Sequence, residues 1–207
     1  MRFVGVTVKK LCFVSLCALL LGLPVALRAE ESVLWKDVDG WSVRADPSLG
    51  NACYIATSYQ EGTTLRLGFD FSGNQKQIYF ALGNARWNSL EAGKEYPIKV
   101  QFDRSPIWDA TATARDIGTS MLLVATTTDT NFVAEFAKKL TVRAEFNGRQ
   151  IAKLRLDRSA KAITAMLDCQ RAVNEVTAKS APSPSQSDPF EQTPKSEVKS
   201  SDDPFDL

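Results

Sequence analysis

The chain has no histidine among its 207 residues, and this absence excludes several classes of active site. Without an imidazole the chain cannot build a Ser-His-Asp triad, a Cys-His pair, a histidine metal site or a histidine pH switch. It also lacks a zinc-binding motif, a phosphate-binding glycine-rich loop and a dinucleotide fingerprint. We therefore expect no enzymatic activity, no metal and no cofactor.

An excess of charge of one sign is missing too, since 25 lysines and arginines stand against 24 aspartates and glutamates. Nucleic-acid-binding domains normally carry a basic patch and a high isoelectric point. This near-neutral balance argues against nucleic acid as a partner.

Long apolar runs are absent except near the N-terminus, where residues 11–27 follow Arg2, Lys9 and Lys10. A cationic start, a short apolar core and a polar switch at Glu30 are typical of a secretory signal. We predict a signal peptide over residues 1–29 and no membrane span after its cleavage; an uncleaved anchor is the alternative. The predicted location is the periplasm or the exterior.

Cysteine is scarce, and two of the four cysteines, Cys12 and Cys17, lie in the predicted signal. An even pair in an oxidising compartment favours a disulfide, which predicts a Cys53–Cys169 bridge. Cys53 begins a strand-like run, whereas Cys169 shares a helical stripe with Ala162, Met166 and Val173. The bridge is therefore expected to link a sheet to a helix.

Apolar and polar residues alternate in many segments between residues 41 and 156, for example over 64–71, 98–102 and 140–146. Such alternation is typical of half-buried strands, and Asn147-Gly148 predicts a type I′ hairpin turn. Helical spacing is confined to residues 129–139 and about 159–176. We predict a mainly β (α+β) fold: an antiparallel β-sandwich or squashed barrel of about eight strands with a C-terminal helix, forming a single domain over residues 30–177.

From residue 178 the composition shifts, with seven serines and five prolines among the last 30 residues. So polar a segment buries too little surface to offset chain entropy, which predicts a disordered acidic tail over residues 178–207. The tail repeats Asp-Pro-Phe, so Phe190 and Phe205 are candidate docking residues, as is the terminal Leu207. The alternative is a solvated spacer.

Two further sets of residues are candidates for function. Trp35, Trp41, Trp87 and Trp108 could form an exposed stacking platform or could fill the core. A carboxylate-based hydrolase would need a pair drawn from acidic residues that also suit turns, namely Asp37, Asp39, Asp103, Asp109 and Asp116.

Several segments together resemble a known group of proteins. They are Gly40–Val43, Gly50–Tyr54, Gly62–Asp70, Asn84–Leu90, Gly93–Ile98 and Leu167–Cys169. The chain resembles uncharacterised exported (periplasmic) proteins of alphaproteobacteria of the rhizobial type, from about Trp41 to Cys169. The resemblance implies a periplasmic or secreted location and supplies no assigned activity and no catalytic residue. A looser likeness exists to invasion-associated exported proteins of related bacteria, which usually have a different cysteine pattern.

These observations predict an exported, non-enzymatic binding or envelope-associated module with a flexible C-terminal tail. The expected partner is a protein, a peptide or a glycan. The alternative is a secreted effector or inhibitor that acts on a host or competitor protein.

Overall fold

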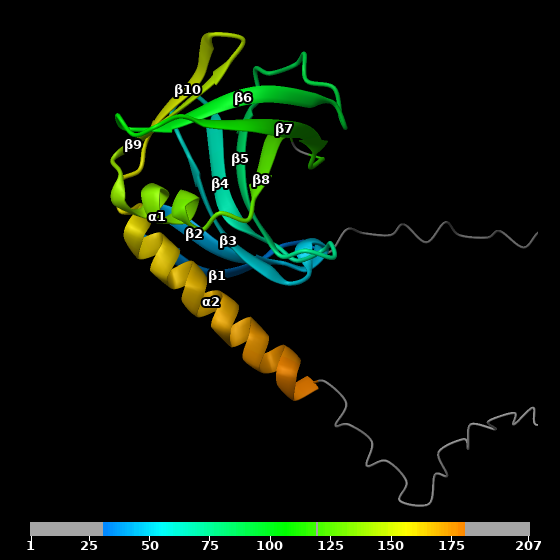
Figure 1. Ribbon diagram of the computed structural model, residues 1–207. Coiled ribbons are helices and arrows are strands. Elements are labelled where there is room, and N and C mark those ends of the chain that lie inside the picture. The colour runs from blue at the N-terminus through cyan, green and yellow to red at the C-terminus, as the bar shows by residue number, and fades with distance from the viewer. Residues whose placement is uncertain (1–30, 119, 181–207) are drawn as a thin grey trace, which may run out of the picture.

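The computed structural model describes residues 31–118 and 120–180, which form one antiparallel sheet and two α-helices (Figure 1). The strands are β1 (Val33–Val38), β2 (Trp41–Asp46), β3 (Ala52–Ser58), β4 (Thr63–Asp70), β5 (Gln77–Asn84), β6 (Glu95–Phe102), β7 (Trp108–Asp116), β8 (Met121–Thr127), β9 (Thr141–Phe146) and β10 (Arg149–Arg155). The helices are α1 (Asn131–Lys138) and α2 (Ser159–Ser180).

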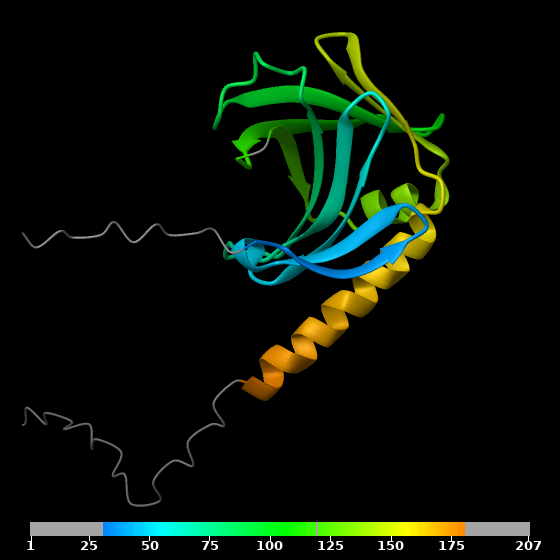
Figure 2. The ribbon, with the colours of Figure 1, turned by 180° about the vertical axis from the view of Figure 1, so that it is seen from behind.

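The sheet has the strand order β1-β2-β3-β4-β5-β8-β7-β6-β9-β10, and every neighbouring pair is antiparallel. It curls strongly without closing into a barrel, as the two opposite views show (Figures 1 and 2). The prediction of a mainly antiparallel β fold with a C-terminal helix is confirmed. The described residues contribute ten strands rather than about eight, in one sheet.

Local sequence explains the last hairpin directly. Asn147 and Gly148 both have positive φ, 49° and 71°, as a type I′ turn requires, and they join β9 to β10. The register of this pair shifts between Gln150 and Ala152, so one residue of β10 is bulged. The predicted turn is confirmed.

The core lies on the inner face of the sheet and is filled from within by α1. Phe132 of α1 packs edge-on against Phe80 and Phe102, and Phe136 packs edge-on against Phe102 and Trp41. The helix begins after Thr130, and the Asn131 N–H donates to the Asp129 carboxylate. The two aromatic side chains are buried, so α1 serves as a plug for the curled sheet.

Helix α2 packs on β1, β2 and β3 and on α1, and the predicted disulfide fixes it there. Cys53 of β3 and Cys169 of α2 are bridged across 116 residues, and both are fully buried. Beside the bridge, the Cys53 N–H donates to Gln170 Oε1 at 2.7 Å. The expected stripe of Ala162, Met166 and Cys169 is buried, and the helix extends to Ser180, beyond the predicted domain end at 177.

A second, smaller apolar cluster lies on the opposite face of the sheet, around Tyr54 and Tyr79. The two tyrosines flank Gly68 in the register, where an added Cβ would lie 2.3 Å from the Tyr54 Cβ. A glycine is therefore required at this position of the central strand β4, because any larger residue would collide with Tyr54. Strands β3, β5 and β8 thus carry buried apolar residues on both faces.

The predicted signal peptide over residues 1–29 and nearly all of the predicted tail lie outside the described residues. Phe190, Phe205 and Leu207 lie there as well. Within residues 31–118 and 120–180, no helix is long and apolar enough to cross a bilayer.

Candidate functional site

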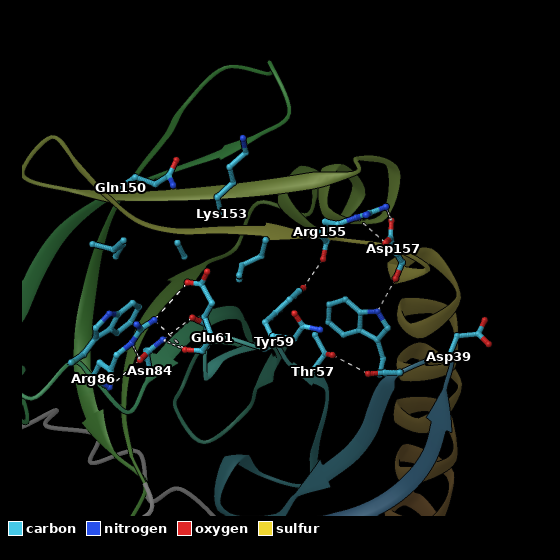
Figure 3. A pocket seen from close by; sticks show the side chains of 18 residues that line it. Asp39, Thr57, Tyr59, Glu61, Asn84, Arg86, Gln150, Lys153, Arg155 and Asp157 are labelled. Atoms are coloured by element: carbon cyan, nitrogen blue, oxygen red, sulfur yellow. Dashed lines mark hydrogen bonds and ion pairs between the residues drawn. The ribbon is translucent and has the colours of Figure 1, made fainter.

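The candidate site is a cleft of about 820 Å³ that runs along β10 at the open seam of the sheet (Figure 3). One wall is β10 itself, from Gln150 to Arg155. The other wall comes from the β1–β2 hairpin, the β3–β4 hairpin, and the end of β5 with the loop that follows it. A cleft of this volume is in the usual range for binding a ligand.

Two hydrogen bonds close one end of the cleft. The Tyr59 hydroxyl donates to the Arg155 carbonyl at 2.5 Å, and the Trp41 indole N–H donates to the Asp157 carbonyl at 3.0 Å. Figure 3 shows both bonds at one end, with open space between β10 and the side chains of Glu61 and Arg86 at the other. The cleft is therefore a wedge that is closed where β10 ends.

Tyr59 is the titratable residue at the closed end. Burial, together with the nearby Asp157 carboxylate, raises the pKa of the Tyr59 hydroxyl to about 12. The hydroxyl therefore keeps its proton, and its bond to Arg155, through the whole neutral range.

The raised pKa predicts a loss of stability in alkali that depends on Tyr59. Between pH 10 and 12 the unfolded chain loses this proton while the folded chain retains it, so the free energy of unfolding falls as the pH rises. At pH 11 the free energy of unfolding should be lower by at most about 1 kcal/mol. The effect is limited because part of the Tyr59 side chain is in contact with solvent, which weakens the pKa shift. Urea unfolding at pH 8 and pH 11 should show a smaller loss in Tyr59→Phe than in the unchanged protein.

Tyr79 provides an internal reference for that measurement, since burial raises its pKa as well and it is present in both proteins. At pH 8, Tyr59→Phe should itself cost about 1 kcal/mol through the lost hydrogen bond. Equal alkaline losses in the two proteins would contradict the role given to Tyr59.

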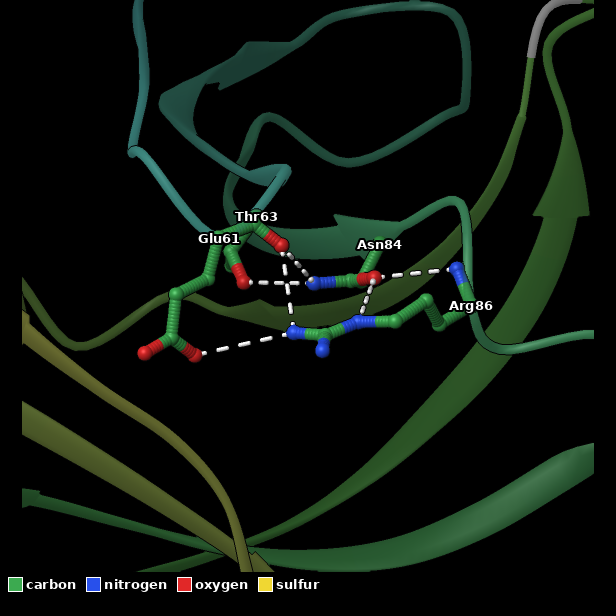
Figure 4. A network of polar contacts seen from close by, with 4 residues as sticks. All are labelled: Glu61, Thr63, Asn84 and Arg86. Atoms are coloured by element: carbon green, nitrogen blue, oxygen red, sulfur yellow. Dashed lines mark hydrogen bonds and ion pairs between the residues drawn. The ribbon is translucent and has the colours of Figure 1, made fainter.

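The opposite wall is organised by Asn84, which is buried at the end of β5 (Figure 4). Its amide nitrogen donates to the Glu61 carbonyl at 3.0 Å and to the Thr63 hydroxyl at 2.8 Å. Its amide oxygen accepts from the Arg86 backbone N–H at 2.9 Å. The Arg86 guanidinium also donates to the Glu61 carbonyl, at 3.2 Å. One buried amide thus fixes both the β3–β4 hairpin and the loop after β5.

Each carboxylate that lines the cleft forms an ion pair with an arginine or a lysine side chain. Glu61 lies 3.6 Å from Arg86, and Asp157 lies 3.0 Å from Arg155. Asp39 lies 3.1 Å from Lys161, which holds the pKa of the Asp39 carboxyl below its ordinary value. A general acid needs a raised carboxyl pKa, so this pairing suits binding better than acid–base catalysis.

The structure separates the four tryptophans. Trp41 and Trp87 both line the cleft, Trp41 buried and Trp87 half-buried against the core. Trp108 packs edge-on against Phe132, and Trp35 is about half exposed on the edge strand β1. The four indoles therefore form no common platform, and two of them belong to one site.

The remaining aspartates hold local structure. Asp103 accepts hydrogen bonds from the Leu140 N–H and from the backbone and hydroxyl of Thr141. Burial alone would raise the pKa of Asp103, but these hydrogen bonds outweigh it and hold the pKa below its ordinary value. Asp109 lies 3.8 Å from Lys99, and Asp116 accepts from the Gly118 N–H. Asp37 lies in β1, on the exposed edge strand.

Sequence reasoning did not single out Tyr59, Asn84, Arg86 or the edge of β10. Asn84 and Arg86 stand in the segment Asn84–Leu90, which contributed to the family resemblance, but nothing local predicted that they face β10. Within residues 31–118 and 120–180, no group of three or more Cys, Asp or Glu side chains is arranged to hold a metal ion.

No family model matches the chain, and no curated protein matches its sequence. Among solved structures, the chain is similar to invasion-associated protein B from Bartonella henselae, with a TM-score of 0.48 and 10% sequence identity. The match covers 66% of this chain and 97% of that one, and no residue role is carried over from it.

Proposed function

We propose that this protein is an exported, non-enzymatic binding module of the bacterial envelope that holds its ligand in the cleft along β10. In this proposal it is related to exported proteins of alphaproteobacteria, acts in the periplasm or outside the cell, and carries a C-terminal tail after α2. A buried disulfide supports an oxidising compartment, because such bridges rarely persist in the cytosol.

The observation that carries the proposal is the composition of the cleft. Hydrogen-bonding side chains and the half-buried indole of Trp87 line a wedge of about 820 Å³, which is a surface suited to recognising a polar chain with apolar side groups. The carboxylates of the cleft are held in ion pairs that support its walls. In this proposal they therefore do not serve as the general acid and base of a hydrolase. Binding is therefore favoured over hydrolysis.

Photo-crosslinking in the living cell tests this proposal. A photoreactive amino acid replaces Gln150, which lines the cleft and is exposed, or Arg115, which is exposed on β7 away from the cleft. The full chain is expressed in both cases, and the adducts are analysed from envelope fractions. Discrete adducts from position 150 and none from position 115 are expected.

Two results would overturn the proposal. One is recovery of the protein in the cytoplasm with no adducts from position 150. The other is chemical change of the captured ligand on incubation with the purified protein, since a binding module returns its ligand intact. The Arg86→Ala variant should weaken the crosslink from position 150, because Arg86 supports the facing wall.

A further inference from the structure

We propose that the cleft-facing edge of β10 binds an extended, acidic peptide segment of a partner protein as an additional strand of the sheet. This inference rests on the proposed function, because it names the ligand class of the same cleft.

The backbone of β10 faces the cleft with hydrogen-bonding groups that the sheet does not use. In the sheet β10 pairs with β9 alone, so its other side is an edge. The Arg155 carbonyl points into the cleft, where it accepts from Tyr59. Backbone groups alternate between the two sides of an antiparallel strand, so the N–H and carbonyl of Lys153 point the same way. Among the described residues, no hydrogen bond engages Lys153 from the cleft side.

The same alternation places charge along this edge. Lys153 and Arg155 are exposed, whereas the residues that alternate with them, Ala152, Leu154 and Leu156, are buried in the core. Arg155 is paired with Asp157, but Lys153 has no ion pair within the described part of the chain. A strand added beside β10 would bring every second side chain next to this basic row. Cross-strand pairs of opposite charge stabilise such an addition, so acidic residues fit there.

The residues between those acids would face the inner side of the sheet. Trp87 lies on that side, half-buried against the core, and Trp41 lines the same cleft. Indole surfaces suit apolar side chains. The recognised segment is therefore expected to alternate acidic and apolar residues, with the apolar set turned toward Trp87.

The shape of the cleft defines the ends of the bound segment. At the Arg155 end the Tyr59 and Trp41 hydrogen bonds already occupy two carbonyls, so the added strand must stop there. At the Gln150 end the wedge is open, and the β10 bulge next to Gln150 interrupts the regular pairing pattern. About five residues of β10 remain for pairing, or roughly 17 Å of extended chain.

A peptide scan tests the added strand without altering the protein. The probe is an eight-residue peptide of alternating glutamate and valine, blocked at both ends and labelled with fluorescein. Its binding to the full exported chain is followed by fluorescence anisotropy. Replacing its glutamates by lysines should weaken binding at least tenfold. Single N-methylation along the probe should weaken binding about tenfold at every second position only, because alternate N–H groups face β10.

Variants of the protein provide an independent test. Lys153→Pro removes the outward N–H together with the charge, and proline is tolerated where an edge N–H faces away from the sheet. Lys153→Gln removes the charge alone, and Lys36→Gln on the other edge strand is the matched control. We expect peptide binding to weaken about tenfold in Lys153→Pro and about threefold in Lys153→Gln. Binding should be unchanged in Lys36→Gln. If Lys153→Pro does not fold, the N-methylation scan still decides the matter.

The outcomes separate this inference from the proposed function. A glycan that binds and is lost in Arg86→Ala, with no response to the peptide, would leave the binding module standing and overturn the added strand. N-methylation effects without a period of two would also overturn it. A tenfold gain in peptide affinity in the Phe190→Ser, Phe205→Ser double variant would show that the chain's own tail occupies the cleft, which would overturn assignment to a partner.

Discussion

Replacing Cys169 with alanine is expected to lower the free energy of unfolding by about 4–5 kcal/mol. The Cys53–Cys169 bridge closes a loop of 116 residues, and releasing so long a loop returns much conformational entropy to the unfolded chain. Thermal unfolding should show a melting temperature lower by about 10 °C or more. Differential scanning calorimetry of the oxidised protein provides the measurement.

Three matched samples make this result specific to the bridge. The Cys53→Ala variant, the double variant and the reduced wild-type protein should all melt close to Cys169→Ala, because each lacks the same single link. A melting temperature unchanged by reduction would contradict the prediction. The hydrogen bond from the Cys53 N–H to the Gln170 side chain would then be enough to hold α2 on β3 without the disulfide.

Phe136→Ala is expected to destabilise the protein by about 3–5 kcal/mol, because it removes the fully buried end of the α1 plug. The Phe136 ring packs edge-on against Trp41, with 5.8 Å between ring centroids, and against Phe102 at 6.1 Å. The cavity left by its removal would lie between the helix and the inner face of the sheet. Chemical denaturation followed by tryptophan fluorescence should show both the lower midpoint and a change at Trp41.

The conservative Phe136→Leu variant should recover most of the lost stability, whereas Lys138→Ala on the same helix should be nearly neutral. Because Trp41 also donates to the Asp157 carbonyl, Phe136→Ala should loosen the closed end of the cleft as well. A loss below 1 kcal/mol in Phe136→Ala would show that α1 does not support the inner face of the sheet.

Periodicity identifies strands in which buried apolar residues alternate with polar residues. Leu65 and Leu67 alternate with polar residues in β4, and Val142 and Ala144 alternate in β9, so periodicity identifies both strands. β8 is buried on both faces, because Leu123 joins the main core and Leu122 joins the second cluster. Its continuous apolar run therefore shows no alternation.

The edge strand β1 and the inner strand β7 show no clear alternation in the sequence for other reasons. In β1 every residue but the last is exposed, so it has no core face to create a pattern. In β7 the buried residues are Ala112 and Ala114, which differ little in hydrophobicity from the neighbouring threonines. These strands join the sheet through backbone pairing rather than through large apolar side chains.

The cleft could not be predicted because its walls meet only when the sheet curls. Trp41 and Asp157 are 116 positions apart, as Cys53 and Cys169 are, and nothing in either local segment shows that they touch. Whether an indole faces a cleft or the core depends on this long-range closure. The buried amide of Asn84 gave no sequence signal, since asparagine next to glycine also suits a turn.

The long loop closed by the disulfide also determines when the bridge can form during synthesis of the chain. Cys53 and the first strands are synthesised well before α2, the helix that covers them. At 5–20 residues per second, the 116 residues between the two cysteines take about 6–23 s to appear. Throughout that interval the inner faces of β2 and β3 lack their cover and the Cys53 thiol lacks its partner. The bridge to β3, and the cover that α2 gives to β2 and β3, can therefore form only after α2 has been synthesised.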